Sequence, residues 1–200
     1  MKTMKMKLVV LSVLFAFTGA AQSSSADSSL VISSNTVQQI VLQDLQATAL
    51  DLINWKIGDT TSYDIEMGAF GKLGTMTKTA TKNEDKAVWI KNDADLGGQK
   101  DVTEILISRT DGKILKMIHN GQEQSVPDDK IEIISQEYTE ITVPAGKFKC
   151  VHIVAKSKQT EKMEIWANPQ AVALDGGIQM IVATQMGEMT LKLTSFKKNN

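Results

Sequence analysis

Cysteine, histidine and aromatic residues are scarce in this 200-residue sequence. Its lone cysteine, Cys150, excludes a disulfide bond within the chain, so stability must come from packing. We expect Cys150 to be a small buried residue of a strand, the alternative being a bond to a second chain. With 5% aromatic residues, a site that stacks sugars or nucleic-acid bases is poorly supported.

The usual signatures of catalytic and metal sites are also absent from the sequence. It has no G-x-S-x-G, H-E-x-x-H, Walker loop or C-x-x-C motif. Nucleophilic catalysis needs a base, and His119 and His152 are the only imidazoles. Cys150 and His152 share a face of an expected strand, but two ligands do not complete a zinc site. We therefore expect no metal, no cofactor and no catalysis, with a minor hydrolase whose site residues are dispersed as the alternative.

No apolar run in the sequence is long enough to span a membrane. The longest, Leu8–Phe17, is interrupted only by Ser12; it follows Lys2, Lys5 and Lys7 and precedes the small residues 18–21. This order predicts a secretory signal peptide over residues 1–21, the alternative being a buried N-terminal helix. A lipid-anchored protein would need a cysteine just after the run, and the only cysteine is Cys150. We therefore expect a soluble periplasmic or secreted protein rather than a lipid-anchored one.

The charge balance of the expected mature chain restricts its partners. Removal of residues 1–21 leaves 19 basic and 23 acidic residues, a net charge of −4. A mildly acidic protein is poorly suited to nucleic acid or to an anionic membrane surface as its main partner. No integral membrane segment is expected after cleavage of the signal peptide.

The remaining chain is predicted to form one domain. Residues 22–35 are polar and rich in serine, which predicts a disordered leader. Val37, Ile40, Val41 and Leu45 recur at helical spacing, which predicts a helix over about 36–50. A length of about 180 residues suits a single domain, here expected over residues 36–200.

Beyond residue 60 the pattern is that of β-strands. Tyr63, Ile65 and Met67 alternate with polar neighbours, as do the apolar residues of the last hairpin. Asp-Gly at 111–112 and Asn-Gly at 120–121 predict a three-stranded meander over about 102–126. The sequence GKLG at 71–74 predicts another turn. Nine or ten strands with short links predict one largely antiparallel sheet.

Some of these strands are apolar on both faces. Ile105 and Ile107 point to the side opposite Leu106, and Ile114 points opposite to Leu115. Such strands must be covered on both sides by the helix, by curling of the sheet or by a ligand. The predicted fold class is therefore mainly β, a curled antiparallel sheet with an N-terminal helix.

Three short motifs resemble a pattern in secreted β-rich proteins of Gram-negative bacteria. They are Trp-Lys-Ile-Gly-Asp at 55–59, Val-Pro-Ala-Gly-Lys-Phe-Lys-Cys at 143–150 and Trp-Ala-Asn-Pro at 166–169. In outline the pattern is similar to the periplasmic lipoprotein carriers of the LolA/LolB type. The resemblance implies a half-barrel whose concave side is covered by helices and can hold acyl chains. It covers most of residues 55–198.

The expected function is therefore non-catalytic binding of a hydrophobic or amphipathic, lipid-like ligand on a concave sheet. Lipids or lipoprotein acyl chains are the expected partners. Methionine suits adaptable apolar surfaces, although it also simply fills cores. The candidate lining residues are Met163, Trp166, Met180 and Met186. The alternative is a structural or interaction protein of the cell envelope whose apolar surface is used up in its own core.

Overall fold

The computed structural model describes residues 53–126, 131–157, 160–184 and 187–199. The predicted signal peptide, the leader over 22–35 and the helix near 36–50 lie outside these ranges. Within the ranges, no helix is long and apolar enough to cross a membrane.

The described residues form a mainly β structure, as predicted. Its elements are β1 (Thr60–Met67), the 3-10 turn η1 (Gly68–Phe70), β2 (Gly71–Glu84), β3 (Ala87–Leu96), β4 (Gln99–Ser108), β5 (Ile114–His119), β6 (Gln122–Gln124), β7 (Glu132–Val143), β8 (Gly146–Lys156), β9 (Met163–Ala167), β10 (Gly177–Thr184) and β11 (Gly187–Lys197).

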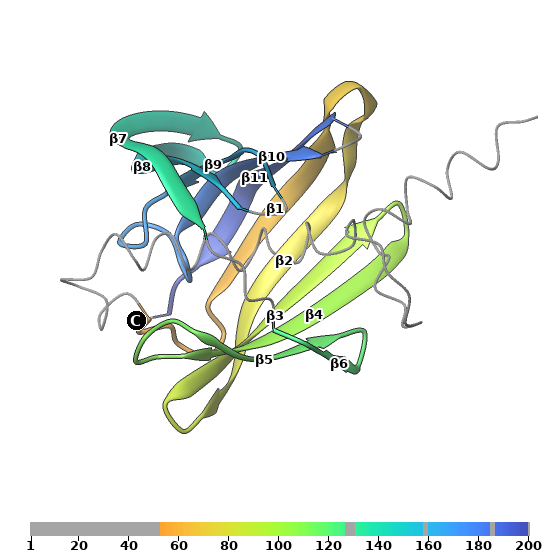
Figure 1. Cartoon of the computed structure of the whole chain (residues 1–200), viewed down its shortest axis with the longest axis vertical. Helices are drawn as coiled ribbons and strands as arrows, with labels where there is room; N and C mark the ends of the chain where they lie inside the picture. The colour runs from red at the N-terminus through yellow and green to blue at the C-terminus, as the bar shows by residue number, and fades with distance from the viewer. Residues whose placement is uncertain (1–52, 127–130, 158–159, 185–186, 200) are drawn as a thin grey trace, which may run out of the picture.

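All eleven of these strands belong to one antiparallel sheet (Figure 1), in the order β6-β5-β4-β3-β2-β1-β11-β10-β9-β8-β7. Most neighbours in the sheet are also neighbours in the chain, because short connections favour antiparallel pairing. The exception is β1, which pairs with β11 and so joins the two ends of the described chain in the middle of the sheet.

The alternation seen in the sequence sets the faces of the sheet. Tyr63, Ile65 and Met67 of β1 are buried, and the residues between them are less so. The predicted meander is confirmed as β4, β5 and β6. Asn120 and Gly121, at φ 47° and 81°, form its second turn, as an Asn-Gly pair predicts.

The turn predicted at residues 71–74 is wrong. These residues are the first part of β2, and the chain reverses one step earlier, at η1. Glycine is required at position 74 of the strand because the neighbouring backbone is very close. A Cβ there would lie 1.9 Å from the carbonyl oxygen of Asp95. Glycine signals both turns and close backbone approach, and the sequence alone does not separate them.

The motif Pro144-Ala145-Gly146 connects β7 to β8 as a tight turn, with Gly146 at φ 135°. The turn also brings distant strands together. The Ala145 N–H donates to the carbonyl oxygen of Leu193 in β11 at 3.0 Å. The rings of Phe148 in β8 and Phe196 in β11 lie 6.2 Å apart.

These contacts show that the sheet curls. In sheet order β8 and β11 are three strand spacings apart, which would be about 14 Å in a flat sheet. Figure 1 shows the two ends of the sheet bending toward the same side. The inner face of the curled sheet is the buried one.

Two apolar clusters fill much of the inner face. The large core draws mainly on β1 and β8–β11, with Met76 and Leu96 from β2 and β3. The small core lies over β2–β4 and includes Ile53 and Trp55, which precede β1. The connection between β9 and β10, residues 168–176, supplies both: Val172 packs in the large core, and Ala173 and Leu174 in the small one.

Candidate functional site

A row of polar side chains crosses the inner face between the two apolar clusters. Thr61 of β1 pairs with Lys78 of β2, Lys78 with Asn92 of β3, Asn92 with Thr103 of β4, and Thr103 with His119 of β5. We call these five residues the polar rung. Each is at most 9% exposed. Polar side chains buried to this degree need partners, so the rung is the part of the core that requires a chemical explanation.

Apolar side chains flank the polar rung on both sides. Residues two positions away along each strand point to the same face, since side chains alternate along a strand. On one side the paired residues are Tyr63, Met76 and Ala94, next to the large core. On the other side they are Ala80, Ile90, Ile105 and Met117. At β2 and β3 the inner face therefore presents a polar strip between two apolar ones, whereas on β4 the position next to Ala94 is taken by Asp101.

Lys78 is neutralised by a residue of the connection between β9 and β10. Its Nζ lies 2.7 Å from Asp175 Oδ2, and both side chains are almost fully buried. The same Nζ lies 5.5 Å from the centre of the Tyr63 ring. A buried ion pair contributes to stability only while both partners are present, because a lone buried charge is strongly destabilising. The pair thus fixes the connection against the centre of the sheet.

Tyr63 adds a second tie between the rung and this connection. Its hydroxyl donates to the carbonyl oxygen of Gly177 at 3.0 Å. Burial raises the pKa of Tyr63 well above its usual value, and the nearby carboxylate of Asp175 raises it further. The nearby Thr61 hydroxyl acts in the opposite direction and lowers the pKa of Tyr63.

Two atoms of the polar rung are buried without a hydrogen-bond partner in the described part of the chain. They are the hydroxyl oxygen of Thr61 and the amide oxygen Oδ1 of Asn92. A third such atom, Trp55 Nε1, belongs to a residue of the small core. An unsatisfied buried polar atom costs about 1–3 kcal/mol of stability. The two rung atoms therefore mark places where a hydrogen-bond donor from outside the described residues would be stabilising.

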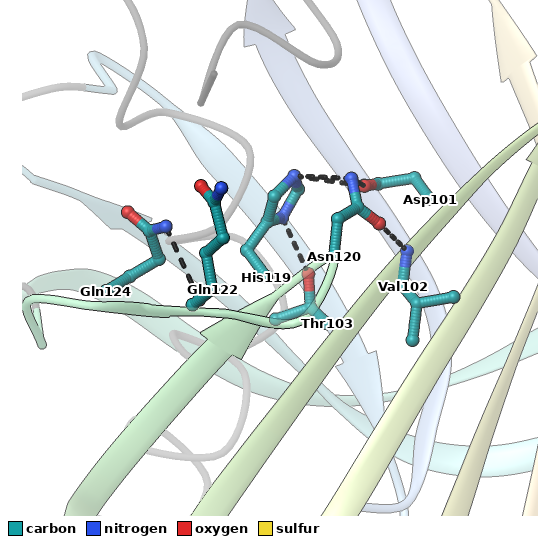
Figure 2. A network of polar contacts seen from close by, with 7 residues as sticks. All are labelled: Asp101, Val102, Thr103, His119, Asn120, Gln122 and Gln124. Carbon is teal, nitrogen blue, oxygen red and sulfur yellow. Dashed lines mark hydrogen bonds and ion pairs between the residues drawn. The ribbon is translucent and has the colours of Figure 1, made fainter. Parts of the chain in front are cut away.

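The far end of the rung is a hydrogen-bonded network around His119 (Figure 2). His119 Nδ1 lies 3.2 Å from the Thr103 hydroxyl, and His119 Nε2 lies 3.1 Å from Asp101 Oδ1. Asn120 Nδ2 donates to the same Asp101 oxygen at 3.0 Å, and Asn120 Oδ1 accepts from the Val102 N–H at 2.9 Å. Because Asp101 is desolvated, its pKa is raised, although His119 and Asn120 act in the opposite direction.

This network contains a hydroxyl, an imidazole and a carboxylate in series, the elements of a proton relay. Acyl transfer would also need hydrogen-bond donors beside the position of a developing oxyanion. The Asn120 amide is occupied by Asp101 and Val102. The arrangement ties β4 to β5 and holds His119 in one orientation.

Three of the four predicted lining residues lie within the described ranges, and all three belong to the large core or pack against it. Met163 and Met180 are buried together in the large core, on neighbouring strands. Trp166 lies on the other face of β9 and is partly buried against that core, and its ring stacks on His152 with centroids 4.2 Å apart. Met186 lies outside the described residues.

His152 is placed between two carboxylates on that outer face. Its Nε2 lies 2.9 Å from Glu164 Oε2, and its Nδ1 lies 3.3 Å from Glu137 Oε1. Hydrogen bonding from Lys162 lowers the pKa of Glu164, and His152 adds to that effect. Within the described ranges, no group of three or more His, Cys, Asp or Glu side chains is arranged to hold a metal. Cys150 is buried and free, and burial raises the pKa of its thiol.

The polar rung was missed from the sequence, although each strand carried a signal for it. Lys78 stands between Met76 and Ala80 at the alternating inward positions, and Asn92 stands between Ile90 and Ala94. A polar residue at an inward position is the available clue. The clue becomes a site only when the register aligns such residues on neighbouring strands.

No protein-family model matches the chain, and no curated protein matches its sequence. Solved structures with a similar arrangement do exist. The hypothetical protein CT021 from Chlamydia trachomatis superposes with a TM-score of 0.49 at 11% identity, over 75% of this chain and 92% of that one. A protein from Bacteroides fragilis with a YmcC-like fold gives 0.46 at 10% identity, over 72% and 97%. MucB of Pseudomonas aeruginosa, in its complex with MucA, gives 0.43 at 11% identity, over 80% and 58%.

Proposed function

We propose that this is a non-catalytic periplasmic or secreted protein that binds an amphipathic, lipid-like molecule on the inner face of its curled sheet. One observation carries the proposal: the buried face has a polar strip between two apolar strips. A protein that only needed a stable core would bury apolar residues across this face, because orphaned polar atoms cost stability. An amphiphile has the complementary pattern of an apolar chain and a polar group.

The apolar part of such a ligand fits the large core best. Met163 and Met180 are its flexible components, and their thioether side chains adapt to chains of different shape. We assign them to the lining, near Met76 and the polar rung. The location in the periplasm or outside the cell rests on the signal-peptide pattern of residues 1–21.

The test is to purify the protein from the periplasm and record its native mass spectrum, then measure uptake of a fluorescent fatty acid. We expect a co-purified acyl species or saturable uptake. Met180→Gln keeps the length of the side chain but makes it polar, so uptake should fall severalfold. Leu115→Gln, a change at an exposed position of β5, should leave uptake unchanged. A clean apo mass with no uptake contradicts the proposal.

The second candidate is an envelope interaction or structural protein without a ligand. It is favoured by the connection between β9 and β10, since Val172, Ala173 and Leu174 fill inner-face volume with the protein's own side chains. If this filling is complete, the protein binds no amphiphile and Met180→Gln changes only its stability.

A further inference from the structure

The unpartnered atoms of the polar rung indicate which kind of polar group the ligand carries. Asn92 Oδ1 is a hydrogen-bond acceptor, and the Thr61 hydroxyl both donates and accepts. Neither has a hydrogen-bond partner among the residues that the structure describes, and both residues are more than nine-tenths buried. A ligand group that satisfies Asn92 must donate a hydrogen bond. A carboxylate or a phosphate diester has no hydrogen to donate.

The charges around the polar rung also favour a head group without an acidic function. The one cation of the rung's centre, Lys78, is already paired with Asp175. At the far end His119 lies against Asp101. An anionic head group would therefore have to compete with a buried carboxylate for Lys78, and a cationic one would enter beside Lys78 itself. A neutral group neither competes with Asp175 for Lys78 nor places a second positive charge beside Lys78, and it avoids the free-energy cost of burying a charge.

The spacing of the two atoms selects a head group with more than one hydroxyl. Thr61 and Asn92 stand on β1 and β3, on either side of Lys78, so their strands are about 10 Å apart. A single hydroxyl does not reach both side chains, whereas several hydroxyls on a sugar or polyol are distributed over a comparable span.

We propose that the polar rung binds an uncharged, hydroxylated head group of an amphiphile, through hydrogen bonds to Asn92 Oδ1 and Thr61 Oγ1. This inference rests on the proposed function, because it needs an amphiphile on the inner face. It adds that a glycolipid-like or polyol-like head is preferred over a fatty-acid carboxylate or an ammonium head.

The experiment compares three probes with the same twelve-carbon chain: dodecyl glucoside, dodecanoate and dodecyltrimethylammonium. Binding to the full chain is measured by calorimetry below the critical micelle concentrations. We expect dodecyl glucoside to bind at least tenfold more tightly than either charged probe. Asn92→Leu and Thr61→Val each remove an orphaned polar atom with little change of volume. Both should reduce this preference at least fivefold and leave dodecanoate affinity unchanged.

A matched control and a stability measurement separate the outcomes. Thr79→Val makes the same chemical change as Thr61→Val, one position from the rung on the opposite face of β2, and should keep the full preference. Both rung variants should unfold at a higher temperature than the wild type, since an unsatisfied atom is removed. Equal binding of the three probes, or an unchanged preference in both rung variants, overturns the inference and leaves the proposed function standing. Absence of binding by all three probes contradicts the proposed function itself.

Discussion

Tyr63 is a polar residue in an almost fully buried position, and its ionisation is therefore linked to folding. Burial and Asp175 raise its pKa in the folded protein. A raised pKa means that the folded state holds the phenolic proton more tightly than the unfolded state does. This contribution to stability is fully present below the unfolded pKa of about 10 and is lost as pH rises above it.

Tyr63→Phe tests this linkage. At neutral pH the variant should lose about 1 kcal/mol of unfolding free energy, because the hydrogen bond to Gly177 is removed. Above about pH 10 the wild type should lose stability faster than the variant, so the difference should shrink and then reverse. Urea denaturation from neutral to alkaline pH measures both effects. Tyr138→Phe is the control, since Tyr138 is fully exposed at 91%. Parallel alkaline loss in wild type and Tyr63→Phe would show that Tyr63 is not the titrating group.

The sequence predicts whether a side chain is buried or exposed where the alternation along its own strand determines the face to which it points. The alternation over β1 correctly placed Tyr63, Ile65 and Met67 inside. The partners of a residue were not predictable in this way. The register between strands depends on turns and on bulges such as the one between Ala80 and Lys82, which no strand encodes in its own pattern.

At the scale of elements, the short connection between β9 and β10 contributes to both apolar clusters and to the buried ion pair with Lys78. Asn168, Pro169 and Gly176 are residues typical of loops, and they give no sign of its contacts with the core. In the structure it inserts Ala173 and Leu174 into the small core and Asp175 beside Lys78. Lys78 and Asp175 are 97 residues apart, so local sequence gives no indication of their contact.

Gly176 fixes the end of this connection. Its φ is +71°, and an added Cβ would lie 2.3 Å from the backbone nitrogen of Pro169. Gly97, in the turn between β3 and β4, has a similar φ of +63° with open space around it. The two glycines share a backbone requirement and differ in their surroundings.

Gly176→Ala should therefore destabilise the protein by at least about 2–3 kcal/mol, since backbone strain and overpacking act together. Gly97→Ala should cost about 1 kcal/mol, from strain alone. Thermal and urea denaturation of both variants measure the difference. In Gly176→Ala we also expect tryptophan fluorescence to shift, because Trp55 shares the small core with Leu174. Equal losses in the two variants would mean that the connection is not held against Pro169.

At the scale of the whole molecule, the sequence predicted that the sheet curls. Strands that are apolar on both faces cannot remain half exposed, and in β4 the consecutive residues Ile105, Leu106 and Ile107 are indeed all buried. The position of the curl was not predictable. It is set by the contact of the turn at Ala145 with Leu193, between strands that are not neighbours in the sheet.

A double-mutant cycle on Phe148 and Phe196 tests this curvature in solution. Their ring centroids lie 6.2 Å apart at 59°, a tilted arrangement within the range of interacting aromatic pairs. In a curled sheet, Phe148→Ala and Phe196→Ala should be coupled by about 0.5–1.5 kcal/mol. Their combined effect on unfolding free energy should then fall short of the sum by that amount. The control cycle pairs Phe148→Ala with Phe70→Ala, an exposed residue of η1, and should be additive. Additivity in both cycles would mean that β8 and β11 do not touch and that the sheet is flat in solution. A flat sheet would also lack the enclosed inner face on which ligand binding depends.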